Sequence, residues 1–296
     1  MDPNLRKLEE AALEIREFFE AANKSIYTRS DIEEVLAANR NEWRLNKKMS
    51  VKTFIEFMAG PGGLIEAEFN FPSRKEVRYL WGEPSAFELA QSLKPNAYLT
   101  HHGAMYLNGL TPERPETIYL NQEQALRHQR SSELLQEGID AAFQRRARVS
   151  NEVAQHGDTR VCVVHGQRTD GLGVIGMSGP NGEQLRVTNV ERTLIDITVR
   201  PIYSGGVSEV LGAYRAAKDK VSVPKLIEIL EKMNYVYPYH QAVGFYIETA
   251  GVYDESELRP FRAMPLGYDF YLDYNMSDTQ YSEKWRIHFP KQMLVR

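Results

Sequence analysis

The chain has 296 residues, of which 42% are hydrophobic and 26% are charged. This composition is typical of globular proteins, and the length suffices for two domains. No apolar run approaches the roughly 20 residues of a membrane-spanning helix, and the first residues lack the basic and then apolar pattern of a secretory signal. The single cysteine, Cys162, cannot form an internal disulfide, and we expect it buried on a strand of a cytoplasmic protein. The net charge of −4 excludes a strongly basic nucleic-acid-binding chain, so DNA binding would have to rest on local charge.

The N-terminal residues predict three helices in succession. Apolar residues recur at helical spacing over 3–22, which predicts the first helix. Ser30 is a suitable N-cap for a second helix, and Ser50 is a suitable N-cap for a third. The glycines within 60–63 are expected to end the third helix.

A β-hairpin is predicted next. Residues 64–71 alternate between apolar and polar, residues 72–75 form a turn with two basic side chains, and alternation resumes as far as Trp81. Three helices followed by a basic-tipped hairpin is the order of a winged helix-turn-helix, whose third helix enters the DNA major groove. We therefore expect a winged-helix DNA-binding domain over 1–82 and a second domain over 85–296.

Basic residues gather where such a domain would meet DNA. Residues 40–52 carry five basic side chains against one acid, whereas the predicted first helix carries five glutamates. This separation of charge suits a domain with a basic docking face and an acidic opposite face. The alternative interpretation is that the basic residues belong to a solvated helix end. Lysine and arginine neutralise phosphates, and hydroxyls can bond phosphates or base edges. The candidate DNA-contacting residues are Arg44, Lys47, Lys48, Ser50, Lys52, Thr53, Arg74, Lys75 and Arg78.

The second domain is predicted to mix helices and strands. Short helices are expected at 84–90 and 100–108, a strand at 117–120, a helix at 132–147, strands at 160–165, 172–177 and 184–189, helices at 190–199, 206–218, 223–233 and 239–250, and a closing hairpin at 266–289. The helix at 132–147 would end in Arg145, Arg146 and Arg148, which form either a second basic patch or a favourable charge at a helix C-terminus. The predicted fold class is thus α+β, with an N-terminal winged helix-turn-helix and a larger mixed α/β domain.

Several patterns invite a catalytic or metal-binding interpretation that their spacing does not favour. Adjacent His101 and His102 would point about 100° apart on a helix, so they cannot easily bind one ion. The glycines between 166 and 182 lie between short strands and lack a following Gly-Lys-Ser/Thr, which predicts a meander rather than a phosphate-binding loop. Ser222 and Lys225 match the Ser-x-x-Lys of acyl-transfer enzymes, but the companion Lys-Thr-Gly is absent, and Ser222 as the N-cap of a helix with Pro224 in its first turn explains the same residues.

The remaining polar residues predict structure rather than catalysis. Arg192 and Asp196 are four residues apart on a predicted helix, and with Glu191 they are expected to form a partly buried structural motif. Three further carboxylates show no spacing that suits acid–base or two-metal chemistry: Glu248, Asp269 and Asp273. We therefore expect that the protein is not an enzyme and that it binds no metal and no cofactor.

Three sequence phrases stand out by their order and spacing. They lie within 98–111, 187–214 and 241–251, and their most distinctive residues are Thr100-His101-His102-Gly103-Ala104, Glu191-Arg192-Thr193-Leu194-Ile195-Asp196 and Gln241-Ala242-Val243-Gly244-Phe245. In this order they resemble the AbiEi antitoxins of type IV toxin–antitoxin systems. With the N-terminal helices and hairpin, the resemblance covers most of the chain.

The resemblance implies a protein with two roles. Its winged helix would repress its own operon by binding upstream inverted repeats in double-stranded DNA, with two copies on the DNA. Its C-terminal domain would counteract a cognate AbiEii-type nucleotidyltransferase toxin, typically without a stable complex. The acidic overall charge departs from what DNA binding favours, and the resemblance assigns no role to 266–296.

Two alternative functions remain open from the sequence. One is an antitoxin that binds its toxin directly and whose winged helix is purely structural. The other is an enzyme related to nucleases or nucleotidyltransferases, whose activity would depend on Asp269 or Asp273.

Overall fold

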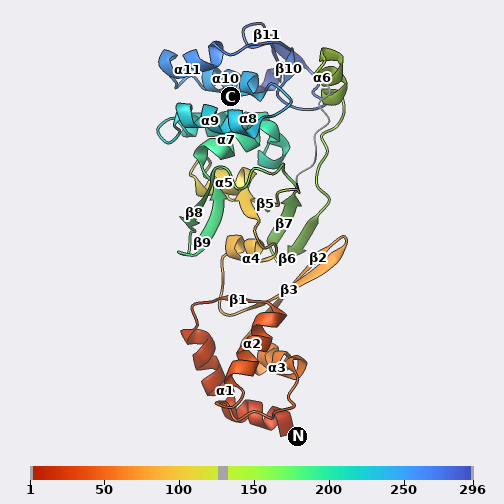
Figure 1. Cartoon of the computed structure of the whole chain (residues 1–296), viewed down its shortest axis with the longest axis vertical. Helices are drawn as coiled ribbons and strands as arrows, with labels where there is room; N and C mark the ends of the chain where they lie inside the picture. Colours follow the sequence, from red (N-terminus) through yellow and green to blue (C-terminus); the bar gives the residue numbers. More distant parts are fainter. Residues whose placement is uncertain (1–2, 126–132, 295–296) are drawn as a thin grey trace.

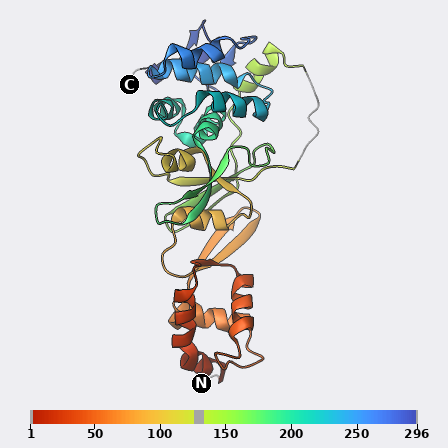
Figure 2. The same cartoon turned by 60° about the vertical axis from the view of Figure 1, so that its left-hand side comes forward.

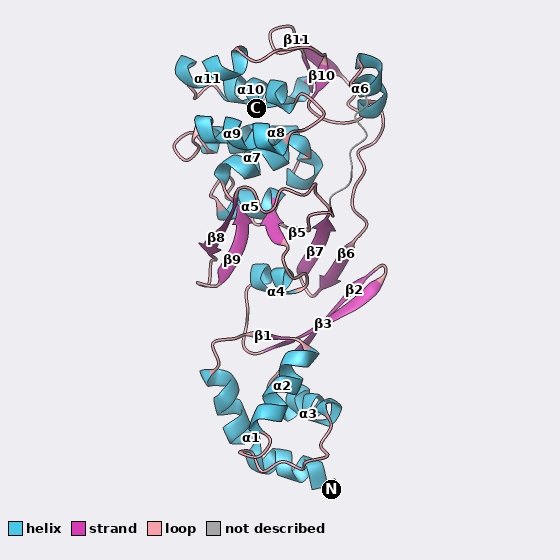
Figure 3. Ribbon diagram, viewed as in Figure 1, coloured by secondary structure: helices cyan, strands magenta, loops and turns pink. Residues whose placement is uncertain are grey.

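A computed structural model describes residues 3–125 and 133–294 and shows an elongated molecule of mixed helices and sheets (Figure 1). Helices of the N-terminal residues form one end, strands gather in the middle, and a layer of helices with the C-terminus forms the other end (Figures 1 and 3). This confirms the mixed use of helices and strands. In the described ranges no helix is both long and apolar enough to cross a membrane.

The N-terminal unit contains the three predicted helices, the hairpin and one short strand that the sequence did not predict. Its elements are α1 (Pro3–Ala21), β1 (Ile26–Tyr27), α2 (Arg29–Asn39), α3 (Val51–Phe57), the π-helix η1 (Met58–Gly62), β2 (Ile65–Phe71) and β3 (Arg74–Leu80). Figure 2 shows the helices standing apart from the rest of the chain, with the hairpin leading away from them.

Local signals at the helix ends explain most of these bounds. The helix α2 is capped by Thr28, whose side chain accepts from the Asp31 backbone while the Asp31 carboxylate accepts in return, so the predicted cap at Ser30 was wrong by two residues. Ser50 caps α3 as predicted, with its Oγ 3.1 Å from the Thr53 nitrogen. The glycines do not stop this helix at once, because the chain continues as a π-helix until Gly63 adopts a left-handed conformation (φ 98°).

The connection between α2 and α3 is long and packed. It runs over residues 40–50, whereas a helix-turn-helix joins its two helices by three or four residues. Trp43 is 4% exposed and stacks on Phe54 with 6.0 Å between ring centroids. Arg40 fixes the loop by donating to the carbonyl oxygens of Asn46 (2.7 Å) and Met49 (3.1 Å). The connection is thus an ordered part of the core, and the winged-helix geometry remains a prediction.

The hairpin joins the N-terminal helices to the central sheet. Its strands form the sheet β1-β3-β2, and its base packs with the helices through Leu64 and Tyr79. Beyond the base, Phe69 and Phe71 belong to a different cluster that includes side chains of the central sheet. The tip therefore lies beside the strand β6 (Val153–His156) rather than beside α3 (Figure 1). Apolar packing thus continues across the expected domain boundary near 81–85.

A six-stranded mixed sheet forms the middle of the molecule. Its strands run in the order β6-β7-β5-β4-β9-β8, with parallel pairing of β4 with β9 and of β5 with β7. The predicted meander of the strands at 160–189 was wrong, because β7 and the β8–β9 hairpin lie on opposite sides of the central pair. Cys162 is buried on β7, as predicted. The other elements here are α4 (Ala86–Ser92), β4 (Tyr98–Thr100), α5 (His101–Leu107), β5 (Thr117–Asn121), β7 (Thr159–Val164), β8 (Val174–Ser178) and β9 (Gln184–Thr188).

One predicted helix of this region is shorter than expected. The predicted helix at 132–147 is α6 (Gln136–Phe143), and its expected first residue lies outside the described residues. Leu135, which immediately precedes this helix, is 57% exposed. The three arginines follow the helix rather than forming its last turn, which corrects the helix-end interpretation of that cluster.

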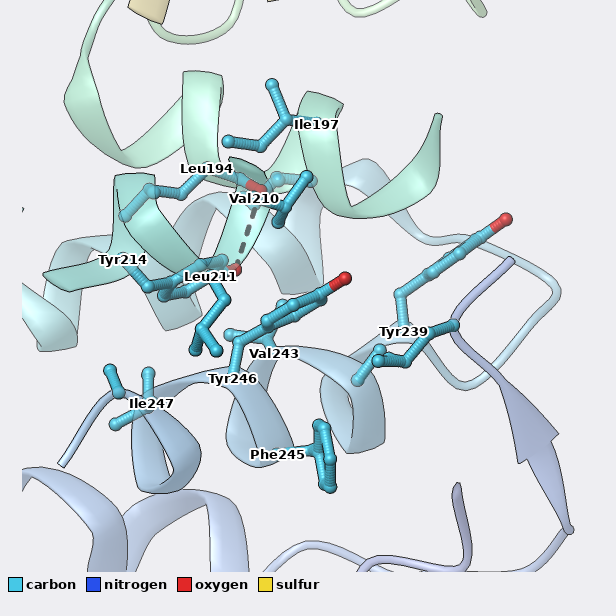
Figure 4. Close-up of a cluster of buried hydrophobic side chains, with 14 of the residues drawn as sticks. Leu194, Ile197, Val210, Leu211, Tyr214, Tyr239, Val243, Phe245, Tyr246 and Ile247 are labelled. Carbon is cyan, nitrogen blue, oxygen red and sulfur yellow. Dashed lines mark hydrogen bonds between the residues drawn. The ribbon is translucent and has the colours of Figure 1, made fainter. Parts of the chain in front are cut away.

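Helices close the far side of the sheet over the largest hydrophobic cluster. The Tyr214 and Tyr246 rings stack there at 5.1 Å between centroids, and the Tyr214 hydroxyl donates to the Leu194 carbonyl at 3.4 Å (Figure 4). The elements are α7 (Val190–Val199), η2 (Pro201–Ser204), α8 (Val207–Ala216), α9 (Val223–Met233), α10 (Tyr239–Ala250), α11 (Glu255–Arg262), β10 (Phe270–Tyr271), β11 (Thr279–Ser282), β12 (Ile287–Pro290) and η3 (Lys291–Leu294).

The C-terminal tail differs from the predicted closing hairpin. Its strands form a small sheet of order β10-β12-β11, in which β10 pairs parallel to β12 and only β11 and β12 are antiparallel neighbours. The helix α11 was not predicted because Pro260 lies inside it, and proline is disfavoured in helix interiors.

Candidate functional site

Three basic side chains lie exposed around the loop that leads into α3. Arg44, Lys47 and Lys48 are exposed, and none of them forms an ion pair with a described residue. Arg44 has a left-handed backbone (φ 52°), and its carbonyl accepts from Lys7 at 3.1 Å. These cations are therefore free to contact a polyanion.

The other candidate residues of this segment are already partly engaged. The Oγ of Ser50 caps α3 and lies 2.9 Å from the Oγ1 of Thr53. Lys52 lies 3.8 Å from Glu56, one helical turn further, and both side chains are mostly exposed. An exposed pair at that distance is weak, so Lys52 can still turn toward a phosphate.

The structure separates the hairpin arginines from α3. Arg78 is 6% exposed and donates from Nη2 to the Ser92 carbonyl of α4 at 2.8 Å. Arg74 is paired with Glu76 and with Glu152, which precedes β6. These contacts correct the predicted grouping of Arg74 and Arg78 with the α3 residues, because both guanidinium groups hold the hairpin to the rest of the fold.

Lys75 and the three arginines after α6 also lie apart from α3. Lys75 is half exposed at the hairpin tip and pairs with Glu68 at 2.5 Å. Arg145 and Arg146 are exposed, whereas Arg148 lines a cavity beside the central sheet. Arg148 is exposed as well, and the second basic patch of these three arginines stays a prediction.

A buried polar centre joins two of the sequence phrases. Arg192 and Asp196 form an ion pair of 2.8 Å within α7, with their side chains 3% and 9% exposed. Asp196 also accepts from the Oγ1 of Thr100 at 2.9 Å, and Arg192 donates to the Leu172 carbonyl at 2.8 Å. This confirms the structural interpretation of the pair, because it ties α7 to the start of α5 and to the loop before β8.

Glu191 extends this motif toward α9. Its carboxylate is 3.3 Å from the Nζ of Lys225 and accepts from the Ser222 backbone at 3.0 Å. Lys225 is therefore directed at Glu191, which supports its structural interpretation, whereas Ser222 lies at the N-cap position of α9 without a side-chain capping hydrogen bond to a described residue.

A third carboxylate in this region was missed by the sequence analysis. Glu123 accepts from the backbone nitrogens of Thr169, Asp170 and Gly171 at 2.9–3.1 Å, and from the hydroxyl of Tyr98 at 3.1 Å. These hydrogen bonds hold the pKa of Glu123 below its usual value despite its burial. The turn at 169–171 was the available signal, but its partner lies some 45 residues earlier in the chain.

The adjacent histidines face different surroundings, as predicted. His101 is 6% exposed and packs against the ring of Tyr203 at 5.2 Å between centroids. Burial lowers the pKa of His101 to about 4, so its ring is neutral at pH 7. His102 is only half-buried and lies near Glu113 and Glu209.

The distal carboxylates are engaged in ion pairs or buried. Glu248 pairs with Arg262 and accepts from the Nε1 of Trp285 at 2.6 Å. Asp269 pairs with Arg286 at 2.9 Å, and burial raises the pKa of Asp273. Over residues 3–125 and 133–294 no three His, Cys, Asp or Glu side chains group closely enough to hold a metal.

Comparisons with known proteins identify a fold but no family. No protein-family model and no curated protein matches the chain. Among solved structures, the crystal structure of the RV2827C protein from Mycobacterium tuberculosis is similar, with a TM-score of 0.63 and 13% sequence identity. The similarity covers 98% of this chain and 94% of that chain. At this identity the two proteins share a fold, and the likeness carries no function by itself.

Proposed function

We propose that the chain is a DNA-binding antitoxin that represses its own operon, with its DNA contacts centred on Arg44, Lys47 and Lys48. The observation that carries this proposal is the set of three exposed, unpaired cations beside the capped N-terminus of α3. A helix N-terminus and free cations both favour phosphate. The order of helices and the three sequence phrases support the antitoxin assignment.

The DNA surface in this proposal is narrower than the sequence predicted. It comprises the loop at 40–50 and the first turn of α3, and it leaves out Arg74 and Arg78 because both are held in the fold. The acidic side chains of α1 lie on the same N-terminal unit and would repel phosphates. The proposed DNA contact is therefore confined to the basic residues of the loop and of α3. Two copies on an inverted repeat would double the number of phosphate contacts.

Fluorescence anisotropy on DNA from immediately upstream of the operon tests this proposal. We expect binding at least about 10³ tighter than to a scrambled duplex. Lys47→Ala combined with Lys48→Ala should remove most of this affinity. The matched control combines Lys232→Ala with Lys291→Ala, which removes the same charge from exposed pairs elsewhere. Equal, weak binding to operator and scramble would contradict the proposal.

A second candidate function is favoured by the long packed connection before α3 and the anchored hairpin. Both features suit an N-terminal unit that is structural, in which case the antitoxin would bind its toxin directly. Co-purification with the nucleotidyltransferase toxin encoded beside it, at micromolar concentration, would favour this alternative. Failure to co-purify together with specific operator binding would exclude it.

A further inference from the structure

A cavity of about 460 Å³ is lined by residues of the central sheet and of the helical layer, and by no residue of the proposed DNA surface. Cavities that bind small molecules are commonly of this size. Residues from both sides line it, and Arg192 and Asp196 of the buried polar centre are among them. The cavity is therefore built by residues far apart in the sequence.

The charge of the cavity wall is positive. Arg148 and Arg200 line it, and neither forms an ion pair with any residue in the described ranges. Arg192 also lines it, but Asp196 neutralises that charge. The Arg200 guanidinium also lies over the Tyr274 ring at 5.4 Å, so two arginines without an ion pair line a space whose one carboxylate is already paired.

One buried polar ring of the wall also lacks a partner. His101 is only 6% exposed, its Nδ1 has no hydrogen-bond partner among the described residues, and the residue lines the cavity. A buried polar group without a partner is costly in a folded protein. Its presence beside unpaired arginines favours a wall that is completed by a bound molecule.

The combination of groups favours a phosphate over a carboxylate. One arginine suffices to hold a carboxylate, whereas a phosphate monoester carries nearly two charges at pH 7 and matches two arginines. The tyrosine rings of Tyr203 and Tyr235 form part of the wall, and the volume exceeds that of a bare phosphate ion. We propose that this cavity binds a small phosphate monoester of nucleotide size.

Isothermal titration calorimetry of the full chain with AMP tests this proposal without DNA. We expect a dissociation constant between about 10 µM and 1 mM, competition by inorganic phosphate, and no heat with adenosine. Arg148→Gln and Arg200→Gln should each weaken AMP binding at least about tenfold. Arg146→Gln is the matched control, because this exposed arginine lies two residues from Arg148 and outside the cavity wall.

Arg148 is exposed at the cavity rim, so its variant keeps the test informative if Arg200→Gln fails to fold. The variant with Lys47→Ala and Lys48→Ala should bind AMP as the unmodified chain does, which separates this site from the DNA proposal. The proposal is overturned if AMP does not bind at about 5 mM, if adenosine binds as well as AMP, or if Arg146→Gln weakens binding as much as Arg148→Gln.

Discussion

The guanidinium of Arg192 and the carboxylate of Asp196 lie 2.8 Å apart, one helical turn from each other and almost entirely out of solvent. Breaking a buried pair by removing one charge leaves the other charge uncompensated. The pair also connects α7 to its surroundings, because both side chains form hydrogen bonds with neighbouring elements.

Asp196→Asn should therefore be strongly destabilising. The asparagine keeps the shape but leaves the Arg192 charge buried, and we expect a loss of about 3–5 kcal/mol in the free energy of unfolding by urea. Asp170→Asn is the control, because Asp170 pairs with Arg168 on the surface and its loss should cost less than about 1 kcal/mol. Similar losses in the two variants would refute the buried-pair account.

Stability should fall in mildly acidic solution because of His101. Burial lowers the pKa of this ring to about 4, from about 6.5 in the unfolded chain. Between these values the unfolded chain binds a proton that the folded chain does not, so stability is lost as the pH falls through this window. When the pH falls from 7 to 4.5, the free energy of unfolding of the His101→Asn variant should decrease by about 2 kcal/mol less than that of the unmodified chain. Parallel pH profiles would show that His101 is not buried and neutral.

The close approach of Gly244 to Trp285 is also testable. A Cβ at Gly244 would overlap the Trp285 ring, which is 1% exposed, so Gly244→Ala should cost about 1–3 kcal/mol despite the better helix propensity of alanine. Gly212 lies inside α8 with nothing near its Cβ position, and Gly212→Ala should instead stabilise by up to about 1 kcal/mol. A stabilised Gly244→Ala variant would disprove the packing of α10 on the tail.

Glu152 holds the hairpin through Arg74, so we expect it to stabilise the fold although it lies outside the N-terminal unit. Glu152 pairs with Arg74, lies 2.7 Å from the Nε2 of His165, and is mostly buried. Glu152→Gln should cost about 1–3 kcal/mol in urea unfolding, whereas Glu56→Gln, which breaks an exposed pair with Lys52, should cost almost nothing. If both variants behave alike, the hairpin is not held by this carboxylate.

Local signals in the sequence predicted local structure well. The cap at Ser50, the turn between β8 and β9 and the amphipathic helix α9 all depend on neighbouring residues, so the chain reveals them directly. The short strand β4 was not predicted. Its three residues are all buried, so they show no alternating pattern, and only the pairing with β5 and β9 defines the strand.

The arrangement of elements depends on distant contacts that no local pattern records. The hairpin was expected to contact DNA as a wing, but Phe69 and Phe71 are buried in a cluster with side chains of the central sheet. The same limit applies to Glu123, whose partners lie in a turn far along the chain. The pair of Arg192 and Asp196 was predictable because both partners share one helix.

The dependence of operator affinity on salt is the most direct test of the central claim that Lys47 and Lys48 contact phosphates. Each phosphate contact contributes close to one to the slope of log affinity against log salt concentration. Combining Lys47→Ala with Lys48→Ala should therefore lower the slope by about two, while Lys232→Ala with Lys291→Ala should leave it unchanged. An unchanged slope in the first double variant would place the DNA contacts elsewhere and contradict the account.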